Sequence, residues 1–208
     1  MRSPRVLALA AGLAWLALTA CQVAGPPPSI PPVQIGLQRG DLPAGLARCP
    51  ASGDISTFLH GSKPNNEPAH DELLTAWQDL QHRGASQAAL TVYAAQQPAC
   101  TARLGTGDGA NVSSLVVEFH DEATAAAAYQ RGLLGFPTPS DDAEVAGMDR
   151  GAATGIGQNA WVLQRSVAGR ALIVGLWERH AVLVLFVAVD ADPLNAKRAL
   201  SAVDGRIP

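Results

Sequence analysis

The three cysteines of this 208-residue chain are the side chains with the most distinctive chemistry. Cys21, Cys49 and Cys100 each carry a thiol that can be acylated, oxidised to a disulfide or used as a nucleophile. In an oxidising compartment an odd number of cysteines leaves one thiol without a partner. We therefore expect one of the three cysteines to be modified differently from the other two.

The sequence before Cys21 indicates that this is the exceptional one. Arg2 and Arg5 precede an uncharged stretch, residues 6–19, which has the length of a signal-peptide core and is short for a membrane span. Leu18-Thr19-Ala20-Cys21 resembles the bacterial lipobox. The resemblance implies that residues 1–20 are a lipoprotein signal peptide. It also implies that acyl chains such as palmitate on Cys21 anchor the protein in the cell membrane, on its extracytoplasmic face. The alternative is an ordinary secretory signal that ends at Ala20.

If lipid occupies Cys21, the other two cysteines are free to pair with each other. A Cys49–Cys100 disulfide would close a loop of about 51 residues and stabilise the fold by roughly 4 kcal/mol. Two separate buried thiols are the alternative.

No other pattern of residues indicates catalysis or a cofactor. The chain has no G-x-S-x-G sequence and no histidine spacing typical of zinc sites. Gly105, Gly107 and Gly109 lack the Lys-Ser/Thr that a phosphate-binding loop requires. We predict a protein that is not an enzyme and holds no metal or cofactor. The five histidines are His60, His70, His82, His120 and His180.

The long segment 135–160 carries four carboxylates. A loop of this length inside a compact domain is uncommon and is often functional. Its acidic residues do not have the alternating spacing of a calcium loop. The sequence leaves open whether the segment is a solvated loop, a lid or a divalent-cation site. The carboxylates are those of Asp141, Asp142, Glu144 and Asp149.

Two tryptophans on neighbouring predicted strands suggest a ligand site. Trp161 and Trp177 could line a pocket at the sheet edge, with Arg165 at its mouth. The alternative is that both indoles are packed in the core, because aromatic side chains usually contribute core burial.

The elements that would position these residues begin after a proline-rich stretch. Five prolines between Pro26 and Pro32 disfavour helix and favour an extended polyproline conformation. We expect residues 21–47 to be a membrane tether and residues 48–208 to form one extracytoplasmic domain.

Hydrophobic periodicity and capping residues predict helices over 72–83, 122–134 and 193–205, begun by Asp71, Asp121 and Asp192. Five strands are predicted at 90–95, 113–120, 161–167, 170–177 and 182–189. Short connections make the last three a meander. The expected class is α+β: a single antiparallel sheet of five or more strands ending in a three-strand meander, with about three helices packed against it.

Gly155-Ile156-Gly157 and Ala160 match the dinucleotide fingerprint on paper, but a strand and not a helix follows them, which excludes that function. A glycine-rich turn, an aromatic residue, three strands and a final helix over residues 151–207 resemble small actinobacterial-type extracytoplasmic lipoproteins. The resemblance implies the fold. Some related modules serve as ligand-binding or sensor domains.

Composition narrows the function further. Charged residues are 16% and hydrophobic residues 48% of the chain, with a net charge of −3. These values exclude a disordered charged tail and give no sign of a nucleic-acid partner. We expect a lipid-anchored module, held in the bilayer through Cys21, that binds a small ligand or acts as a sensor without catalysis. The alternative is an envelope interaction or structural lipoprotein that recognises a protein or cell-wall partner.

Overall fold

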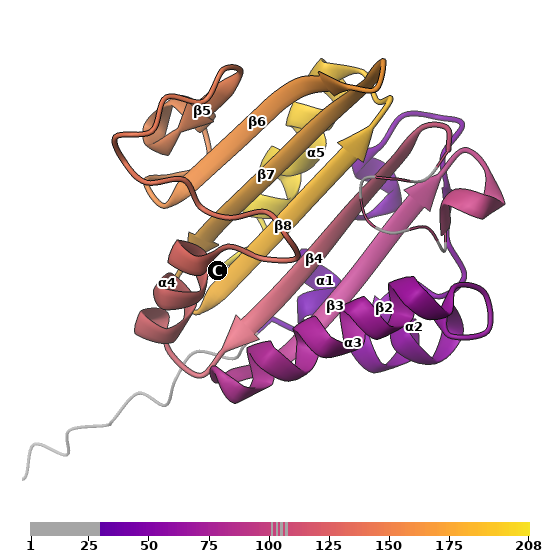
Figure 1. Cartoon of the computed structure of the whole chain (residues 1–208), viewed down its shortest axis with the longest axis horizontal. Helices are drawn as coiled ribbons and strands as arrows, with labels where there is room; N and C mark the ends of the chain where they lie inside the picture. Colours follow the sequence, from indigo (N-terminus) through magenta and orange to yellow (C-terminus); the bar gives the residue numbers. More distant parts are fainter. Residues whose placement is uncertain (1–29, 101, 103, 105, 107) are drawn as a thin grey trace, which may run out of the picture.

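The protein is built on one antiparallel sheet with helices on both faces (Figure 1). The computed structural model describes residues 30–208 except 101, 103, 105 and 107. Within them the strand order is β1–β3–β4–β8–β7–β6–β5, and β2 also pairs with β3. This confirms the α+β class. The eight strands are β1 (Ala47–Arg48), β2 (Gly53–Asp54), β3 (Ala85–Ala94), β4 (Asn111–Phe119), β5 (Met148–Arg150), β6 (Ala160–Val167), β7 (Arg170–Arg179) and β8 (Val182–Val189).

The C-terminal meander of β6, β7 and β8 forms as predicted. The tight turn between β6 and β7 places Ala168 and Gly169 at positive φ. β8 lies between β4 and β7 and is buried along its whole length, which explains why it is apolar on both faces. No helix in the described part of the chain is long and apolar enough to cross a membrane.

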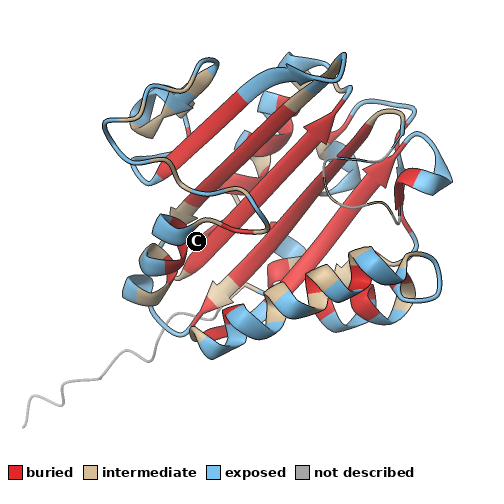
Figure 2. Ribbon diagram, viewed as in Figure 1, coloured by how far each residue is buried: buried red, intermediate tan, exposed pale blue. Residues whose placement is uncertain are grey.

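Each face of the sheet has its own hydrophobic core (Figure 2). Leu115 and Val117 of β4 point to one face, here called the front, and Val112 and Val116 point to the back. The front is covered by α2 (Ile55–Ser62), α3 (Glu67–His82) and α4 (Glu122–Arg131). The back is covered by α1 (Pro32–Ile35) and α5 (Pro193–Asp204). Three short 3₁₀ turns also occur in the described chain: η1 (Arg39–Asp41), η2 (Gln97–Cys100) and η3 (Gly151–Thr154).

Two of the predicted helices begin where their caps indicate. The Asp121 carboxylate accepts the Thr124 N–H at 2.7 Å, and Asp192 accepts the Asn195 N–H at 2.9 Å. α4 ends three residues early, at Arg131, because Gly132 follows at φ 81°. A Cβ at this glycine would lie 2.3 Å from the Phe136 carbonyl oxygen, so the close return of the chain requires glycine here.

α3 begins five residues before its predicted start. Its cap is Asn66, whose side chain accepts the Ala69 N–H at 3.2 Å, and Pro68 occupies the first turn, where proline is favourable. Asp71 lies within the helix and contacts His70 Nδ1 at 2.9 Å. α2 was not predicted, although Ile55, Phe58 and Leu59 have the i, i+3, i+4 spacing of its buried face.

The prediction that residues 21–47 form a tether is wrong for the second half of that segment. Residues 30–46, here called the strap, cross the back of the sheet as part of the domain. Ile35 and Leu37 are each only 1% exposed, and the Leu37 N–H donates to Ser114 Oγ at 2.9 Å. Pro32 begins α1 and does not prevent helix, because proline is tolerated in a first turn. The folded domain therefore includes residues from about 30 onward, and the lipobox and Cys21 lie outside the described residues.

The C-terminal end of the chain holds the strap in place. Arg206 donates to both carboxylate oxygens of Asp41, at 2.6 and 3.1 Å. The same guanidinium donates to the carbonyl oxygens of Ile35 and Gly36, each at 3.0 Å. The Asp41 side chain is 9% exposed, so this bidentate pair is largely shielded from water.

Candidate ligand-binding site

The strongest candidate site is an apolar pocket on the front face, between α2, α3 and strand β3. We call it the slot. It is partly open and small, with a cavity volume of about 40 Å³, below the usual range of small-molecule sites, so a ligand would also occupy the open space at its mouth. Its walls come from five parts of the chain. They are formed by Phe58, Ser62, Ala69, Glu72, Leu73, Leu90, Ala102, Leu104 and Leu134.

The helical walls of the slot follow from local sequence. Phe58 lies on the buried face of α2, and Leu73 lies on that of α3. Ala69 follows the Asn66 cap in the first turn of α3, where its methyl group leaves space that a larger side chain would fill. Leu90 forms the floor from the middle of β3, where it is 1% exposed and pairs with Leu115 of β4.

The polar groups of the slot are engaged within the protein. Ser62 is 4% exposed, and its hydroxyl donates to the Leu59 carbonyl at 3.3 Å. Glu72 also takes part in an interaction within the chain. The described lining therefore presents hydrocarbon to a ligand and offers few hydrogen bonds.

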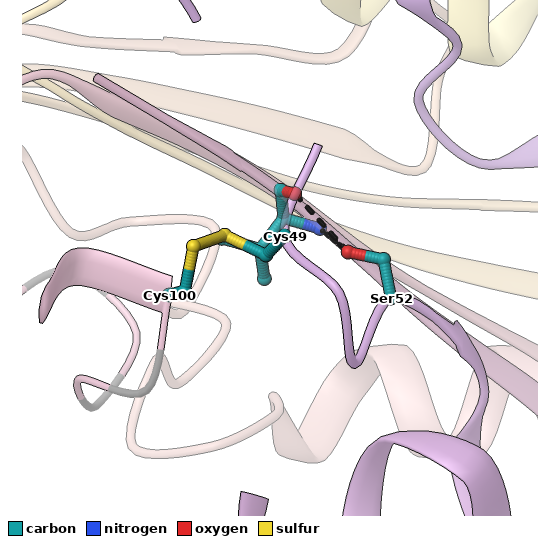
Figure 3. Close-up of a disulfide and its surroundings, with 4 residues drawn as sticks. Cys49, Ser52 and Cys100 are labelled. Carbon is teal, nitrogen blue, oxygen red and sulfur yellow. Dashed lines mark hydrogen bonds between the residues drawn. A yellow bond between two sulfur atoms is a disulfide. The ribbon is translucent and has the colours of Figure 1, made fainter. Parts of the chain in front are cut away.

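The predicted disulfide is confirmed and lies in the front core. Cys49 and Cys100 are bonded, with their Cα atoms 5.4 Å apart, and both belong to the front core. Figure 3 shows the bridge beside Ser52, whose hydroxyl donates to the Val92 carbonyl at 3.1 Å and accepts from the Val92 N–H at 3.0 Å. Cys49 precedes β2 and α2, whereas Cys100 precedes Ala102 and Leu104 of the slot. The bridge thus joins the segment that precedes β2 and α2 to the end of η2, and the bonded cysteines themselves do not line the slot.

The three residues predicted to form a ligand pocket are not brought together. Trp161 belongs to the front core and Trp177 to the back core, at 3% and 0% exposure. Trp161 pairs with Leu176, so the Trp177 side chain points to the opposite face. Arg165 lies on the exposed end of β6, four residues beyond Trp161. The tryptophans are packed core residues, as the alternative interpretation held.

The acidic segment 135–160 is ordered by packing and hydrogen bonds. Phe136 and Met148 pack against the front core, and β5 and η3 lie within the segment. Arg150 donates to the carbonyl oxygens of Ser140 and Ala143, at 2.7 and 2.8 Å. A hydrogen bond from Ser140 lowers the pKa of the exposed Asp142 carboxyl. The segment covers one edge of the front face, and Leu134, just before it, lines the slot.

In the described part of the chain, the histidines and acidic residues do not cluster into a metal site. No group of three or more His, Cys, Asp or Glu side chains there could hold a metal ion. His70 and His180 each contact a single carboxylate, that of Asp71 and that of Glu122, both at 2.9 Å. Gly155 and Gly157 have positive φ and form the turn that leads into β6, as the sequence indicated.

One buried carboxyl stands out on the back face. Burial raises the pKa of Asp204, while the Arg179 guanidinium, 3.2 Å from its Oδ2, and the nearby indole N–H of Trp177 favour the charged form. This cluster lies at the end of α5, on the other side of the sheet from the slot.

No protein-family model, curated protein or solved structure matches the chain. The slot was not found from the sequence either. Phe58, Leu73 and Leu90 have the periodicity of ordinary core residues, and no local signal marks a place where the core is incompletely filled.

Proposed function

We propose that this protein is a membrane-anchored extracytoplasmic module that binds an apolar small molecule in the slot, as a ligand carrier or sensor and without catalysis. The observation that carries the proposal is the slot itself. It is a concave and mostly apolar site, the usual character of a small-molecule pocket.

Two further features support the location. The Cys49–Cys100 disulfide is typical of an oxidising compartment outside the cytoplasm. Leu18-Thr19-Ala20-Cys21 supports lipid attachment at Cys21. The strap, which follows this sequence in the chain, packs on the back of the sheet, and the slot lies on the front.

The alternative of an envelope interaction or structural lipoprotein has less support. Such a protein would present a contiguous exposed apolar patch of several hundred Å². Among the described residues, the exposed large hydrophobic side chains are those of Val167 and Leu194.

The binding proposal is tested by titrating the protein with N-phenyl-1-naphthylamine, a dye whose fluorescence rises in apolar surroundings. The chain from residue 22 onward is suitable, because it keeps both hydrophobic cores. We expect saturable binding that Ala69→Phe weakens at least tenfold by filling the slot. Thr75→Phe is the matched control, because Thr75 is exposed on the same helix. Equal loss in both variants, or no saturable binding by the parent protein, contradicts the proposal.

The anchor is tested separately by the intact mass of the protein extracted from membranes, together with thiol titration. We expect the mass of a chain that begins at acylated Cys21 and contains no free thiol. An unmodified thiol at Cys21 would contradict lipidation and leave the binding proposal standing.

A further inference from the structure

We propose that a second pocket, between the C-terminal ends of α3 and α4, binds a small carboxylate through Arg131 and Arg83. We call it the arginine pocket. Only Leu134 lines both this pocket and the slot, and the arginines do not line the slot. The arginine pocket is therefore a site for a different class of ligand from that of the proposed function.

The arginine pocket has a cavity volume of about 250 Å³ and is partly open. This volume is just below the usual range of small-molecule sites, so we expect a compact ligand. One wall is formed by Ala76, Asp79 and Leu80 of α3 and by Arg83, the residue that caps this helix. The other wall is formed by residues 131–137, where the chain leaves α4.

The wall after α4 is held in place by the protein itself. The backbone groups of Leu133 and Phe136 form two hydrogen bonds with each other, at 3.0 and 2.9 Å. The Thr138 hydroxyl donates to the Tyr129 carbonyl and accepts from the Trp161 indole N–H at 3.3 Å. A wall fixed in this way loses little freedom when a ligand binds, and such preorganisation increases affinity.

The charge of the arginine pocket favours an anion. The exposed Arg131 side chain has no ion pair or hydrogen bond with the described residues. Arg83 forms an ion pair with Asp79 through Nη2, and its Nε and Nη1 remain for other acceptors. Two arginines and one aspartate give the lining one net positive charge, although the whole chain has a net charge of −3.

The same residues indicate which anion fits. The paired N–H groups of a guanidinium match the two oxygens of a carboxylate. One net positive charge balances a carboxylate monoanion better than a phosphate dianion. Leu80, Leu133 and Phe136 offer apolar contacts to the rest of the ligand. The expected class is a monocarboxylate with a compact apolar body, for which benzoate is a suitable probe.

The test is an NMR titration of the ¹⁵N-labelled chain from residue 22 with sodium benzoate. We expect saturable shifts in the amide signals of residues 132–136. Benzamide, which has the same shape without the charge, should bind about tenfold more weakly. Arg131→Gln should weaken benzoate binding by about the same factor. Arg165→Gln is the matched control, because it removes an exposed arginine from the end of β6 and should leave the benzoate Kd unchanged.

Several results would overturn the proposal. They are the absence of saturable shifts in residues 132–136, equal affinity for benzamide, and unchanged benzoate affinity in Arg131→Gln. Equal weakening in Arg165→Gln would also overturn it, because overall charge would then explain the binding. Dye titration of the slot is the separate readout of the proposed function. Its failure beside intact benzoate binding would contradict the slot and leave the arginine pocket in place.

Discussion

The two faces of the sheet are closed in different ways. The back is covered by the strap and α5, with a bidentate Arg206–Asp41 pair and hydrogen bonds to the strap backbone. A pocket of about 250 Å³ remains between the strap and α5, lined among others by Leu42, Leu46 and Ala196. The front is covered by three helices, α2, α3 and α4, its core contains the Cys49–Cys100 bridge, and the slot lies within it. Directed polar contacts thus hold the covering of the back face, whereas apolar contacts and one covalent bond hold that of the front. We propose that the anchor at Cys21 precedes the strap in the chain and that the ligand site is the slot on the front.

The largest expected effect comes from removing the strap. A chain that starts at residue 48 exposes Tyr93, Val112 and Val116 of the back core and loses the burial of Ile35 and Leu37. Those two side chains alone contribute roughly 1.5–3 kcal/mol each. Domains are stable by only about 5–15 kcal/mol. We expect no cooperative thermal unfolding of this chain, measured by circular dichroism, beside a sharp transition for the chain from residue 30. A sharp transition in both would show that the strap is a tether after all.

The disulfide should have the next largest effect, on the front face. The double variant Cys49→Ala, Cys100→Ala is expected to lose roughly 4 kcal/mol of unfolding free energy in urea titrations. It should also bind the apolar dye more weakly, because the front core, in which the slot lies, loses its covalent bond. Parent protein reduced with dithiothreitol is the control and should behave alike. Unchanged dye affinity in a variant that remains folded would show that the bridge has no influence on binding in the slot.

Breaking the clamp on the back should lower stability without affecting the slot. Arg206→Gln leaves the shielded Asp41 carboxylate without its partner. We expect a loss of about 2 kcal/mol, below the usual value for a buried pair because the Arg206 side chain is 28% exposed. Lys197→Gln is the control. It removes a 3.8 Å contact between two exposed side chains and should cost less than about 0.5 kcal/mol. Dye affinity should be the same in all three proteins, and a change in Arg206→Gln would mean that the faces are coupled.

A pair of helix caps gives a smaller and more selective comparison. Asn66→Ala and Asp192→Ala each remove the side-chain acceptor at the start of a helix, α3 on the front and α5 on the back. Each should cost about 1 kcal/mol in chemical denaturation. Only Asn66→Ala should also weaken dye binding, because Ala69 and Leu73 of the slot lie in the helix that it begins. An equal effect of Asp192→Ala on dye affinity would contradict the assignment of the ligand site to the front face.

The smallest effect concerns pH and the back-face carboxyl. The pKa of Asp204 is raised above its ordinary value of 3.8, mainly by burial. At pH values between the ordinary pKa of the unfolded chain and the raised pKa of the folded state, the folded state binds more protons than the unfolded state. The Asp204 carboxyl therefore makes the free energy of unfolding decrease as the pH rises through this range. Asp204→Asn should flatten that part of the stability curve measured by thermal melting from pH 3.5 upward. A variant whose curve has the same slope there would show that Asp204 is not the titrating group.

Much of the fold could be predicted because its signals are local. Asp121 and Asp192 are caps whose acceptor role depends on the next three residues alone, and the meander depends on short turns between apolar runs. The strap was missed because its proline content resembles a spacer, although its buried residues contact strands 50 or more positions away, as Leu37 contacts Ser114. The disulfide could be anticipated from cysteine counting.

The candidate site was not predictable in the same way. Trp161 and Trp177 are conspicuous in sequence, but their strand register sends them to opposite faces. The slot residues, such as Phe58 and Leu73, do not differ locally from their core neighbours. The empty volume between them arises only when α2, α3 and β3 are placed together.

Hydrogen–deuterium exchange with and without saturating N-phenyl-1-naphthylamine tests the central claim most directly. The account predicts slower exchange in residues 55–62 and 67–82, which form the slot helices, and in residue 104. Exchange in the strap and in α5 should be unchanged. Protection confined to the back face, or spread equally over both faces, would contradict the assignment of ligand binding to the front.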